Sequence, residues 1–245
     1  MASKPTVAYA SYCCSKDRER FVKTQGSHIL SHNYPFDELF QVFQRCDFPV
    51  GQHSFDIPEG YFDKIKGVHT RIKIKEEDYP KILGHFGIKY PDEVADKWTH
   101  GWTASHFWAH HCVNLLRAAM SAESDYIVFA DGDCNMRDQL EGGPSWVEVG
   151  IGTLENNPEM FVVSPSDGRP HGGPDRIMSQ QLFIVNRKRF LEMEFIPWDG
   201  NFMEGGPMAE YYFMMEGRID RHMRKHNLFR YVLPLTYRYW HGAWH

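Results

Sequence analysis

The feature that most constrains the fold is an apolar run that ends in two acidic residues. Residues 126–130 read Tyr-Ile-Val-Phe-Ala, and Asp131-Gly132-Asp133 follow directly. An unbroken apolar run of this length is typical of a strand that is buried on both faces, as in a parallel sheet. An isolated ionised carboxylate is costly to bury, so Asp131 and Asp133 must be solvated, paired or bound to a cation. The sequence therefore predicts a buried strand with a polar site at its carboxyl end.

Strands and helices are predicted to alternate along the chain. The clearest pair is residues 103–120, whose apolar side chains form one helical stripe, followed by the strand at 126–130. The other predicted strands are 6–13, 38–46, 67–74, 160–165 and 180–186, and the other predicted helices are 15–30, 145–157, 187–193 and 207 to about 226. This alternation predicts an α/β fold with a mainly parallel central sheet flanked by helices.

Composition limits the classes of protein to consider. A chain of 245 residues fits one domain, and 42% hydrophobic with 24% charged residues excludes a disordered chain. The N-terminus lacks the apolar run of a signal peptide, and no window approaches the roughly 18 apolar residues that span a bilayer. We therefore expect a cytoplasmic protein without a membrane span. The five cysteines form no C-x-x-C pair, so they are expected to be reduced thiols, mostly buried.

Asp131 and Asp133 are candidate metal ligands. In parallel α/β sheets, ligands bind beyond the carboxyl ends of the strands, and Gly132 lets the chain turn so that both carboxylates face one point. Oxygen ligands in this arrangement suit Mg²⁺ or Mn²⁺. A surface turn is the alternative, because Asp-Gly is a common turn pair. An EF-hand loop is excluded, because Met136 and Gly142 occupy the positions that require Gly and Glu.

The strand ending in Phe-Ala-Asp-Gly-Asp resembles the DxD motif of GT-A fold glycosyltransferases, which use nucleotide-diphosphate sugars. The resemblance runs from the first strand to the C-terminal histidine, and its specific part lies at about 103–133. It implies a single GT-A-like (Rossmann-like) domain over residues 1–245. The donor half would cover about 1–135, and the acceptor and catalytic half about 136–245.

The same resemblance implies a set of metal ligands. Mn²⁺ or Mg²⁺ would be held by Asp131 and Asp133. Many members of the family add a histidine near the C-terminus as a third metal contact, and here the segment Tyr-Trp-His-Gly-Ala-Trp-His supplies His241 and His245. Of these two, His241 is favoured.

A catalytic carboxylate is also implied, on the loop that follows the later strands. The candidates are Asp199, Glu204 and Glu210. An inverting transfer needs one carboxylate to take the proton of the acceptor hydroxyl. Glu204 is favoured because it precedes a Gly-Gly-Pro segment and a helix start, and Asp199 is second. Glu210 falls inside the predicted helix, where it would suit the helix dipole.

Donor-binding residues are predicted at strand ends and in the basic C-terminal segment. Residues 218–245 contain six Lys or Arg and one Asp, which indicates a local anion site or, alternatively, a solvated helix face. Arginine suits bidentate contact with phosphate. The predicted donor-binding residues are Ala10, Ser11, Tyr12, Asp47, Asp131, Gly132, Arg224 and Arg238. Gln180 and Gln181 are candidates to face the sugar or the acceptor, and a turn role is the alternative for Asp47.

The tripeptide Gly-Gly-Pro occurs at 142–144, 172–174 and 205–207. We interpret each copy as a hinge in a polar loop, with proline in the first turn of a following helix. Loops of this kind, above the end of a sheet, commonly carry functional residues.

The leading hypothesis is a metal-dependent glycosyltransferase that moves a sugar from a nucleotide-diphosphate sugar to an acceptor hydroxyl. A glycan is the first choice of acceptor and a hydroxymethylated DNA base the second, with a lipid-linked sugar or a protein also considered. One alternative is a two-metal nucleotidyltransferase or phosphodiesterase, which would need a further carboxylate on a neighbouring strand. The other is a non-enzymatic, calcium-dependent sugar-binding module.

Overall fold

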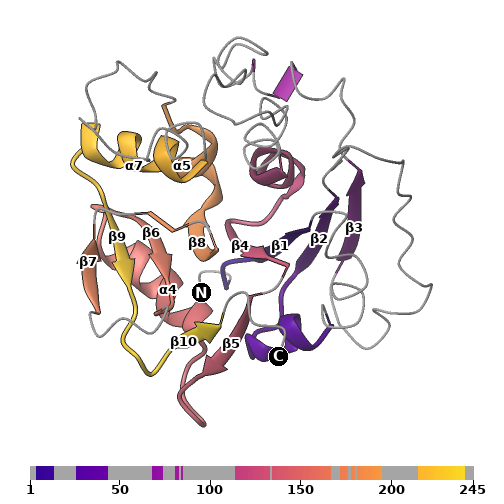
Figure 1. The fold of residues 1–245 in the computed structure, drawn as a ribbon, viewed down its shortest axis with the longest axis vertical. Coiled ribbons are helices and arrows are strands. Elements are labelled where there is room, and N and C mark those ends of the chain that lie inside the picture. The colour runs from indigo at the N-terminus through magenta and orange to yellow at the C-terminus, as the bar shows by residue number, and fades with distance from the viewer. Residues whose placement is uncertain are drawn as a thin grey trace, which may run out of the picture.

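Eight strands of the computed structural model form one mixed sheet, in the order β3-β2-β1-β4-β8-β6-β9-β7 (Figure 1). The structure describes residues 4–13, 26–43, 68–73, 81–82, 84, 114–132, 134–166, 172–175, 178–179, 181–194 and 215–240. The strands are β1 Val7–Cys13, β2 Glu38–Phe43, β3 Val68–Lys73, β4 Tyr126–Asp131, β6 Met160–Ser164, β7 Gly173–Asp175, β8 Leu182–Asn186 and β9 Phe229–Val232. A second, two-stranded sheet pairs β5 Asn135–Asp138 with β10 Arg238–Trp240.

The large sheet is mainly parallel. Strands β3, β2, β1 and β4 run in one direction. Strand β8 is antiparallel to both β4 and β6, so β6 has the direction of β4, and β9 is parallel to β6. Only β7, antiparallel to β9, and β8 run the other way among the described strands. The predicted α/β class with a mainly parallel sheet is therefore confirmed.

Strand β4 is buried along its apolar length because both faces of the sheet are covered. Ile127 and Phe129 belong to one core cluster, together with side chains of helical residues 114–121, of α5 (Arg187–Leu191) and of α7 (Met215–Lys225). Val128 and Ala130 belong to the other cluster, with side chains of helical residues 26–31 and of α4 (Trp146–Asn156). A strand in this position has no solvent face, which explains its unbroken apolar run.

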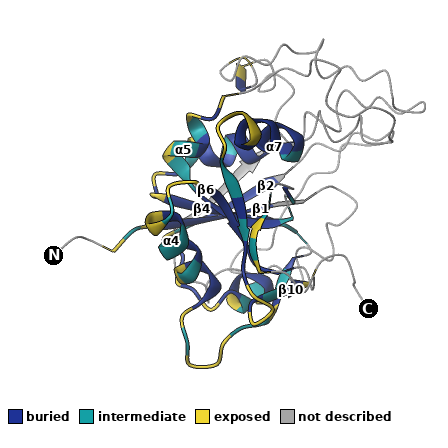
Figure 2. Cartoon of the chain, turned by 90° about the vertical axis from the view of Figure 1, so that its left-hand side faces the viewer, coloured by how far each residue is buried: buried dark blue, intermediate teal, exposed yellow. Residues whose placement is uncertain are grey.

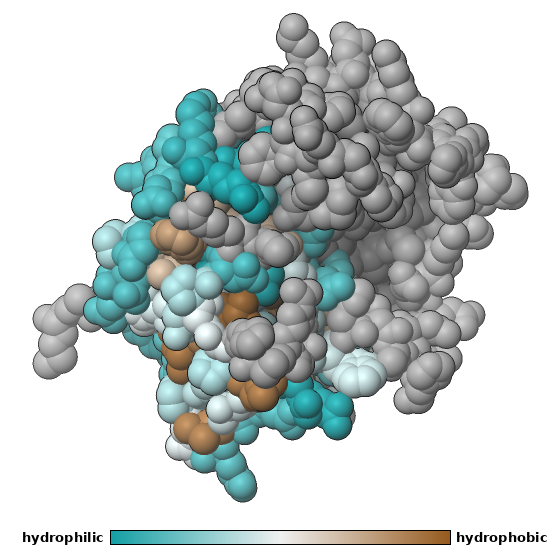
Figure 3. Space-filling model, turned by 60° about the vertical axis from the view of Figure 1, so that its left-hand side comes forward, coloured by the Kyte–Doolittle hydropathy of each residue, from teal (hydrophilic) through white to brown (hydrophobic). Residues whose placement is uncertain are grey.

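The helices form two layers. In Figure 2, α5 and α7 lie on one side of the buried sheet and α4 lies on the other. No helix within the described ranges is long and apolar enough to cross a membrane. On the face shown in Figure 3, hydrophobic side chains occur in small separate groups among hydrophilic ones, as is usual for protein surfaces.

The start of α4 is fixed by a capping box. The Ser145 side chain accepts a hydrogen bond from the backbone N–H of Glu148, and the Glu148 carboxylate accepts one from the backbone N–H of Ser145 at 2.8 Å. Pro144 precedes this N-cap, so the prediction that proline sits in the first turn is wrong for this Gly-Gly-Pro. The copy at 172–174 is not a helix start either, because Gly173 and Pro174 lie in β7 at the edge of the sheet.

Two glycines in α4 give a matched test of how tightly this helix packs on the sheet. A Cβ atom at Gly150 would lie 2.9 Å from Cγ2 of Ile184, whereas one at Gly152 would meet nothing within 4 Å. Gly150→Ala is expected to lower the free energy of unfolding by about 1–3 kcal/mol through overpacking. Gly152→Ala is expected to raise it by about 0.5–1 kcal/mol, because alanine favours a helix interior. Urea denaturation of both variants measures the difference, and equal effects would contradict the packing of α4 on β8.

Candidate functional site

The strand order of the sheet changes side at β1. After β1, the chain forms β2 and β3 on one side of β1, and β4 then pairs with its other side. In open α/β sheets, the crevice beyond the carboxyl ends of the strands at such a switch point is the usual place for a ligand. Asp131 is the last residue of β4 and pairs with Tyr12 near the end of β1. The candidate site therefore lies at this edge, with Asp131 at its centre.

Segments distant in sequence meet beside Asp131. Its backbone N–H donates to the carbonyl oxygen of Gln181 at 2.8 Å, which brings the start of β8 to the site. The Gln181 side-chain oxygen accepts a hydrogen bond from the Tyr239 hydroxyl at 2.8 Å. Ser11, on β1, is fully buried, whereas Asp131 and Gly132 are partly exposed. The structure thus gathers five of the predicted residues, Ser11, Tyr12, Asp131, Gly132 and Gln181, and adds Tyr239.

Strand β10 runs back toward the acidic segment. Trp240 pairs with Asn135, and Tyr239 pairs with Met136, in antiparallel register. Asn135, the first residue of β5, lies two residues after Asp133 in the sequence. Trp240, the last described residue, is therefore paired with a residue that follows the acidic segment closely. His241 is the next residue in the sequence.

A histidine that the sequence analysis did not select also reaches the acidic segment. The Nδ1 atom of His28 lies 3.1 Å from the carbonyl oxygen of Gly132, so a neutral ring protonated at Nδ1 donates to that oxygen. Burial lowers the pKa of His28, and the hydrogen bond to Gly132 offsets part of this effect.

Two predicted phosphate-binding arginines are engaged elsewhere. Arg238 is paired with Asp138 of β5, with 2.6 Å between Nη2 and Oδ2. Arg224 donates from Nε to Asp220 of its own helix at 2.7 Å. Helix α7 ends just before β9, which starts at the amino edge of the parallel strands, so Arg224 lies toward the edge opposite Asp131. The structure therefore does not bring Arg224 to Asp131.

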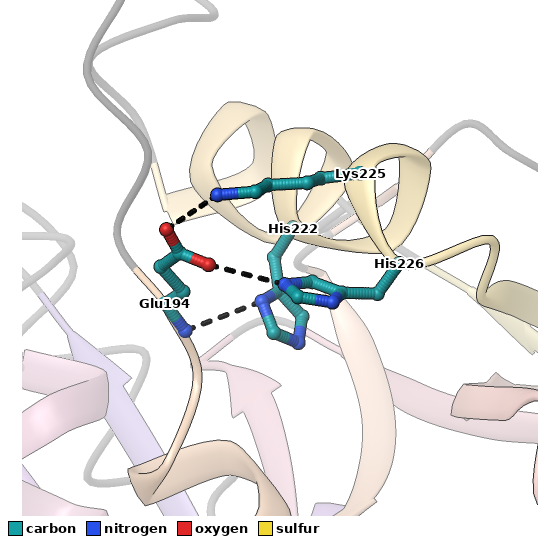
Figure 4. Close-up of polar contacts among 4 residues, drawn as sticks. All are labelled: Glu194, His222, Lys225 and His226. Atoms are coloured by element: carbon teal, nitrogen blue, oxygen red, sulfur yellow. Dashed lines mark hydrogen bonds and ion pairs between the residues drawn. The ribbon is translucent and has the colours of Figure 1, made fainter.

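Basic residues at the end of α7 and just after it, His222, Lys225 and His226, form a second cluster of ionisable groups with Glu194 (Figure 4). The Glu194 carboxylate accepts hydrogen bonds from Lys225 Nζ at 2.6 Å and from His226 Nε2 at 3.2 Å. The Glu194 backbone N–H donates to His222 Nδ1 at 3.2 Å. Burial, aided by the nearby His226, lowers the pKa of His222 to about 4, so its ring is neutral at pH 7. These contacts fasten the segment after α5 to the last turns of α7.

The alternative interpretation of the basic segment, a solvated helix face, fits Arg224 and Lys225, which are exposed, but it does not fit every basic residue. Arg218 and Arg221 of α7 and Arg230 of β9 are each buried, with at most 5% of their surface exposed. Their positive charges lie within the fold.

Several predicted site residues lie outside the described ranges, and their roles stay predictions. They are Asp47, Asp133, Gln180, Asp199, Glu204, Glu210, His241 and His245. Within the described part of the chain, no group of three or more His, Cys, Asp or Glu side chains is placed to hold a metal ion. Asp131 contributes one carboxylate at the switch point, and a carboxylate is the type of ligand that Mg²⁺ and Mn²⁺ take.

Comparison with known proteins gives similarities only at the level of solved structures. No family model matches the chain, and no curated protein matches it. The chain is similar over 96% of its length to the mannosyltransferase PcManGT from Pyrobaculum calidifontis, solved with GDP-Man and Mn²⁺, with a TM-score of 0.49 and 10% identity. It spans 56% of the length of that enzyme.

Two further structures show a similar degree of likeness. Glucosyl-3-phosphoglycerate synthase from Mycobacterium tuberculosis, solved with Mn²⁺, UDP and glucosyl-3-phosphoglycerate, gives a TM-score of 0.44 at 12% identity, over 98% of this chain and 72% of that one. An active-site mutant of LgtC gives a TM-score of 0.45 at 11% identity, over 93% of this chain and 72% of that one.

Proposed function

We propose that this protein is a metal-dependent glycosyltransferase that transfers a sugar from a nucleotide-diphosphate sugar to an acceptor hydroxyl. The observation that carries this proposal is the place of Asp131. The first carboxylate of the Asp-Gly-Asp segment stands at the carboxyl end of β4, beside the end of β1, at the switch point of the sheet. A DxD motif would need this position to reach both a metal ion and the diphosphate of a donor.

The residues at this edge have distinct roles in the proposal. Tyr12, at the end of β1, is the proposed contact with the nucleotide, and the buried residues Ala10 and Ser11 support this strand end from behind. Asp131 and Asp133 hold Mn²⁺ or Mg²⁺, which when bound neutralises charge on the leaving diphosphate. The pairing of Trp240 with Asn135 supports a third contact from the C-terminal segment, and His241 is the candidate there.

An acceptor hydroxyl must lose its proton during transfer. Glu204 is the proposed base, with Asp199 and Glu210 as the other candidates, and the transfer is proposed to invert the anomeric centre. A glycan is the proposed acceptor, and a hydroxymethylated DNA base is the second choice.

The strands beside β4 favour glycosyl transfer over two-metal nucleotidyl transfer. A two-metal site would need a further carboxylate at the end of a neighbouring strand. Among the described residues, β1 pairs Tyr12 with Asp131, and the segment before β8 brings Gln181 to it. Neither residue type carries a charged oxygen ligand at neutral pH.

Donor binding can be tested by thermal unfolding. UDP-, GDP-, dTDP- and CDP-sugars are each added with Mn²⁺, and one of them is expected to raise the Tm. A donor at a concentration one hundred times its Kd stabilises a protein by about 2.7 kcal/mol. For a chain of this size that corresponds to roughly 5–10 °C. The control is the same donor with EDTA in place of Mn²⁺. The proposal fails if no nucleotide sugar shifts the Tm, or if the shift is equal with EDTA.

A further inference from the structure

Helical residues 26–31 and the residue after them are bonded to the segment that follows Asp131. His28 Nδ1 lies 3.1 Å from the Gly132 carbonyl oxygen. One turn later, the Ser31 hydroxyl oxygen accepts a hydrogen bond from the backbone N–H of Met136 at 2.9 Å. The Ser31 carbonyl oxygen accepts another from the side-chain amide of Gln139. These contacts hold the helix against β5 and against the acidic segment.

The same network continues to the start of α4. The Gln139 side-chain oxygen accepts a hydrogen bond from the backbone N–H of Trp146 at 3.3 Å. Trp146 in turn donates from its indole Nε1 to His32 Nδ1 at 2.8 Å. Both Trp146 and His32 are fully buried, and His28 is 5% exposed. A helical segment held at His28, Ser31 and His32 in this way has little freedom to shift relative to the segment after β4.

Within this network, the contact of His28 with the Gly132 carbonyl reaches the Asp-Gly-Asp segment itself. The Gly132 carbonyl belongs to the peptide that joins Gly132 to Asp133, so the orientation of this peptide plane sets the direction in which the chain enters Asp133 after Asp131 and Gly132. Glycine places the weakest restriction on that orientation. The Cys134 backbone N–H donates to the Asp131 carbonyl oxygen at 3.0 Å and closes the turn, and the hydrogen bond from His28 restrains the Gly132 peptide within that turn.

We propose that His28 is a positioning residue for the metal site, which orients Asp131 and Asp133 by donating a hydrogen bond to the Gly132 carbonyl. This inference rests on the proposed function, because it assumes that the two carboxylates hold a divalent ion. Groups that bond to the metal-binding segment from outside fix the ligand geometry, and removing such groups from metal sites typically weakens metal binding by about 10- to 100-fold. Ligands must be held to within about 0.5 Å for full effect.

Three variants separate positioning from general stability. His28→Leu removes the donor at similar volume. His28→Asn places an amide N–H where Nδ1 stood and keeps the donor. His222→Leu is the matched control, because His222 is also buried and bonded through Nδ1 to a backbone group, that of Glu194, but lies at the opposite edge of the sheet.

The measurement is the affinity for Mn²⁺ alone, read from the electron paramagnetic resonance signal of free Mn²⁺ at a temperature well below the Tm of every variant. His28→Leu is expected to weaken Mn²⁺ binding by about 10- to 100-fold, whereas His28→Asn and His222→Leu keep the wild-type affinity. If His28→Leu does not fold, His28→Gln replaces it, because its longer side chain carries the amide past the Nδ1 position.

The outcomes distinguish this inference from the proposed function. Wild-type protein that binds no Mn²⁺ refutes the proposed function and the inference with it. Wild-type protein that binds Mn²⁺ while folded His28→Leu binds it equally well refutes the positioning role alone. Equal weakening in His28→Leu and His222→Leu also refutes it, because the loss would then follow from stability.

Discussion

Asp131→Asn is expected to lower metal-dependent sugar transfer by about 10²- to 10³-fold, a loss of roughly 3–4 kcal/mol of transition-state stabilisation. Asparagine keeps the size of the side chain but removes the charge that would hold the divalent ion. The fold should survive, because Asp131 is partly exposed and its backbone bond to Gln181 does not involve the carboxylate. The assay is release of nucleoside diphosphate from the donor that thermal unfolding identifies, with Mn²⁺ present.

Glu159→Gln is the matched control for this loss of one negative charge. Glu159 is exposed in the turn before β6, and the amino end of β6 lies at the edge of the sheet opposite Asp131. The Glu159→Gln variant should transfer sugar at the wild-type rate. Full turnover by Asp131→Asn would remove the carboxylate from the mechanism, and an equal loss in Glu159→Gln would show that net charge, not the site, matters.

Acidification from pH 7 to pH 4 is expected to destabilise the fold strongly, with His32 as a main cause. His32 is fully buried, and burial, with a smaller contribution from His28, lowers its pKa to about 3. Its Nδ1 accepts the indole hydrogen of Trp146, so a proton cannot be added there without losing that bond. In the unfolded chain the pKa returns to an ordinary value of about 6.5.

The sign of this effect follows from proton binding. Between about pH 6.5 and pH 3 the unfolded state binds a proton at His32 that the folded state does not, so stability falls as the pH falls through this window. His32 alone accounts for about 3 kcal/mol lost by pH 4. His222, with its pKa lowered to about 4, adds to the loss in the same direction.

Urea denaturation at pH 7, 6, 5 and 4 measures this dependence in wild-type protein and in His32→Asn. The asparagine side-chain oxygen can still accept the Trp146 indole hydrogen, but it does not titrate. The variant is expected to be less stable at pH 7, because it leaves space in the core, and to lose about 3 kcal/mol less between pH 7 and pH 4. Parallel pH curves for the two proteins would show that His32 is not the titrating group.

The local sequence predicted most of the large sheet because its central strands are apolar on both faces. The predicted strands correspond to β1, β2, β3, β4, β6 and β8. Strands β5, β7, β9 and β10 were missed. Strand β7 consists of Gly-Pro-Asp, residues that disfavour strands, and β10 has three residues, so pairing partners rather than local preference define them.

The residues of the candidate site likewise fall into those that the local sequence predicts and those that it does not. Asp131 was found from its own neighbours, because an acidic pair after a buried strand is a local signal. His28 and Tyr239 were not, since they meet Gly132 and Gln181 across 104 and 58 residues of sequence. Neither strand alone carries a sequence pattern that predicts the pairing of β10 with β5, which brings Tyr239 to the site.

The sequence could not show that Arg224 lies away from Asp131, for a related reason. The count of basic residues in 218–245 is correct, but it carries no information about which edge of the sheet they reach. The direction of β9 decides that, and it places the end of α7 at the edge opposite Asp131.

The most direct test of the central claim is a calorimetric titration of UDP and GDP into wild-type protein and Asp131→Asn, each with Mn²⁺ and with EDTA. A metal-dependent glycosyltransferase is predicted to bind one of these nucleotides with Mn²⁺, to bind it much more weakly with EDTA, and to lose the Mn²⁺ effect in Asp131→Asn. Nucleotide binding that is equal with and without Mn²⁺, and unchanged in Asp131→Asn, would contradict the assignment of the Asp131-Gly132-Asp133 segment as a metal and donor site.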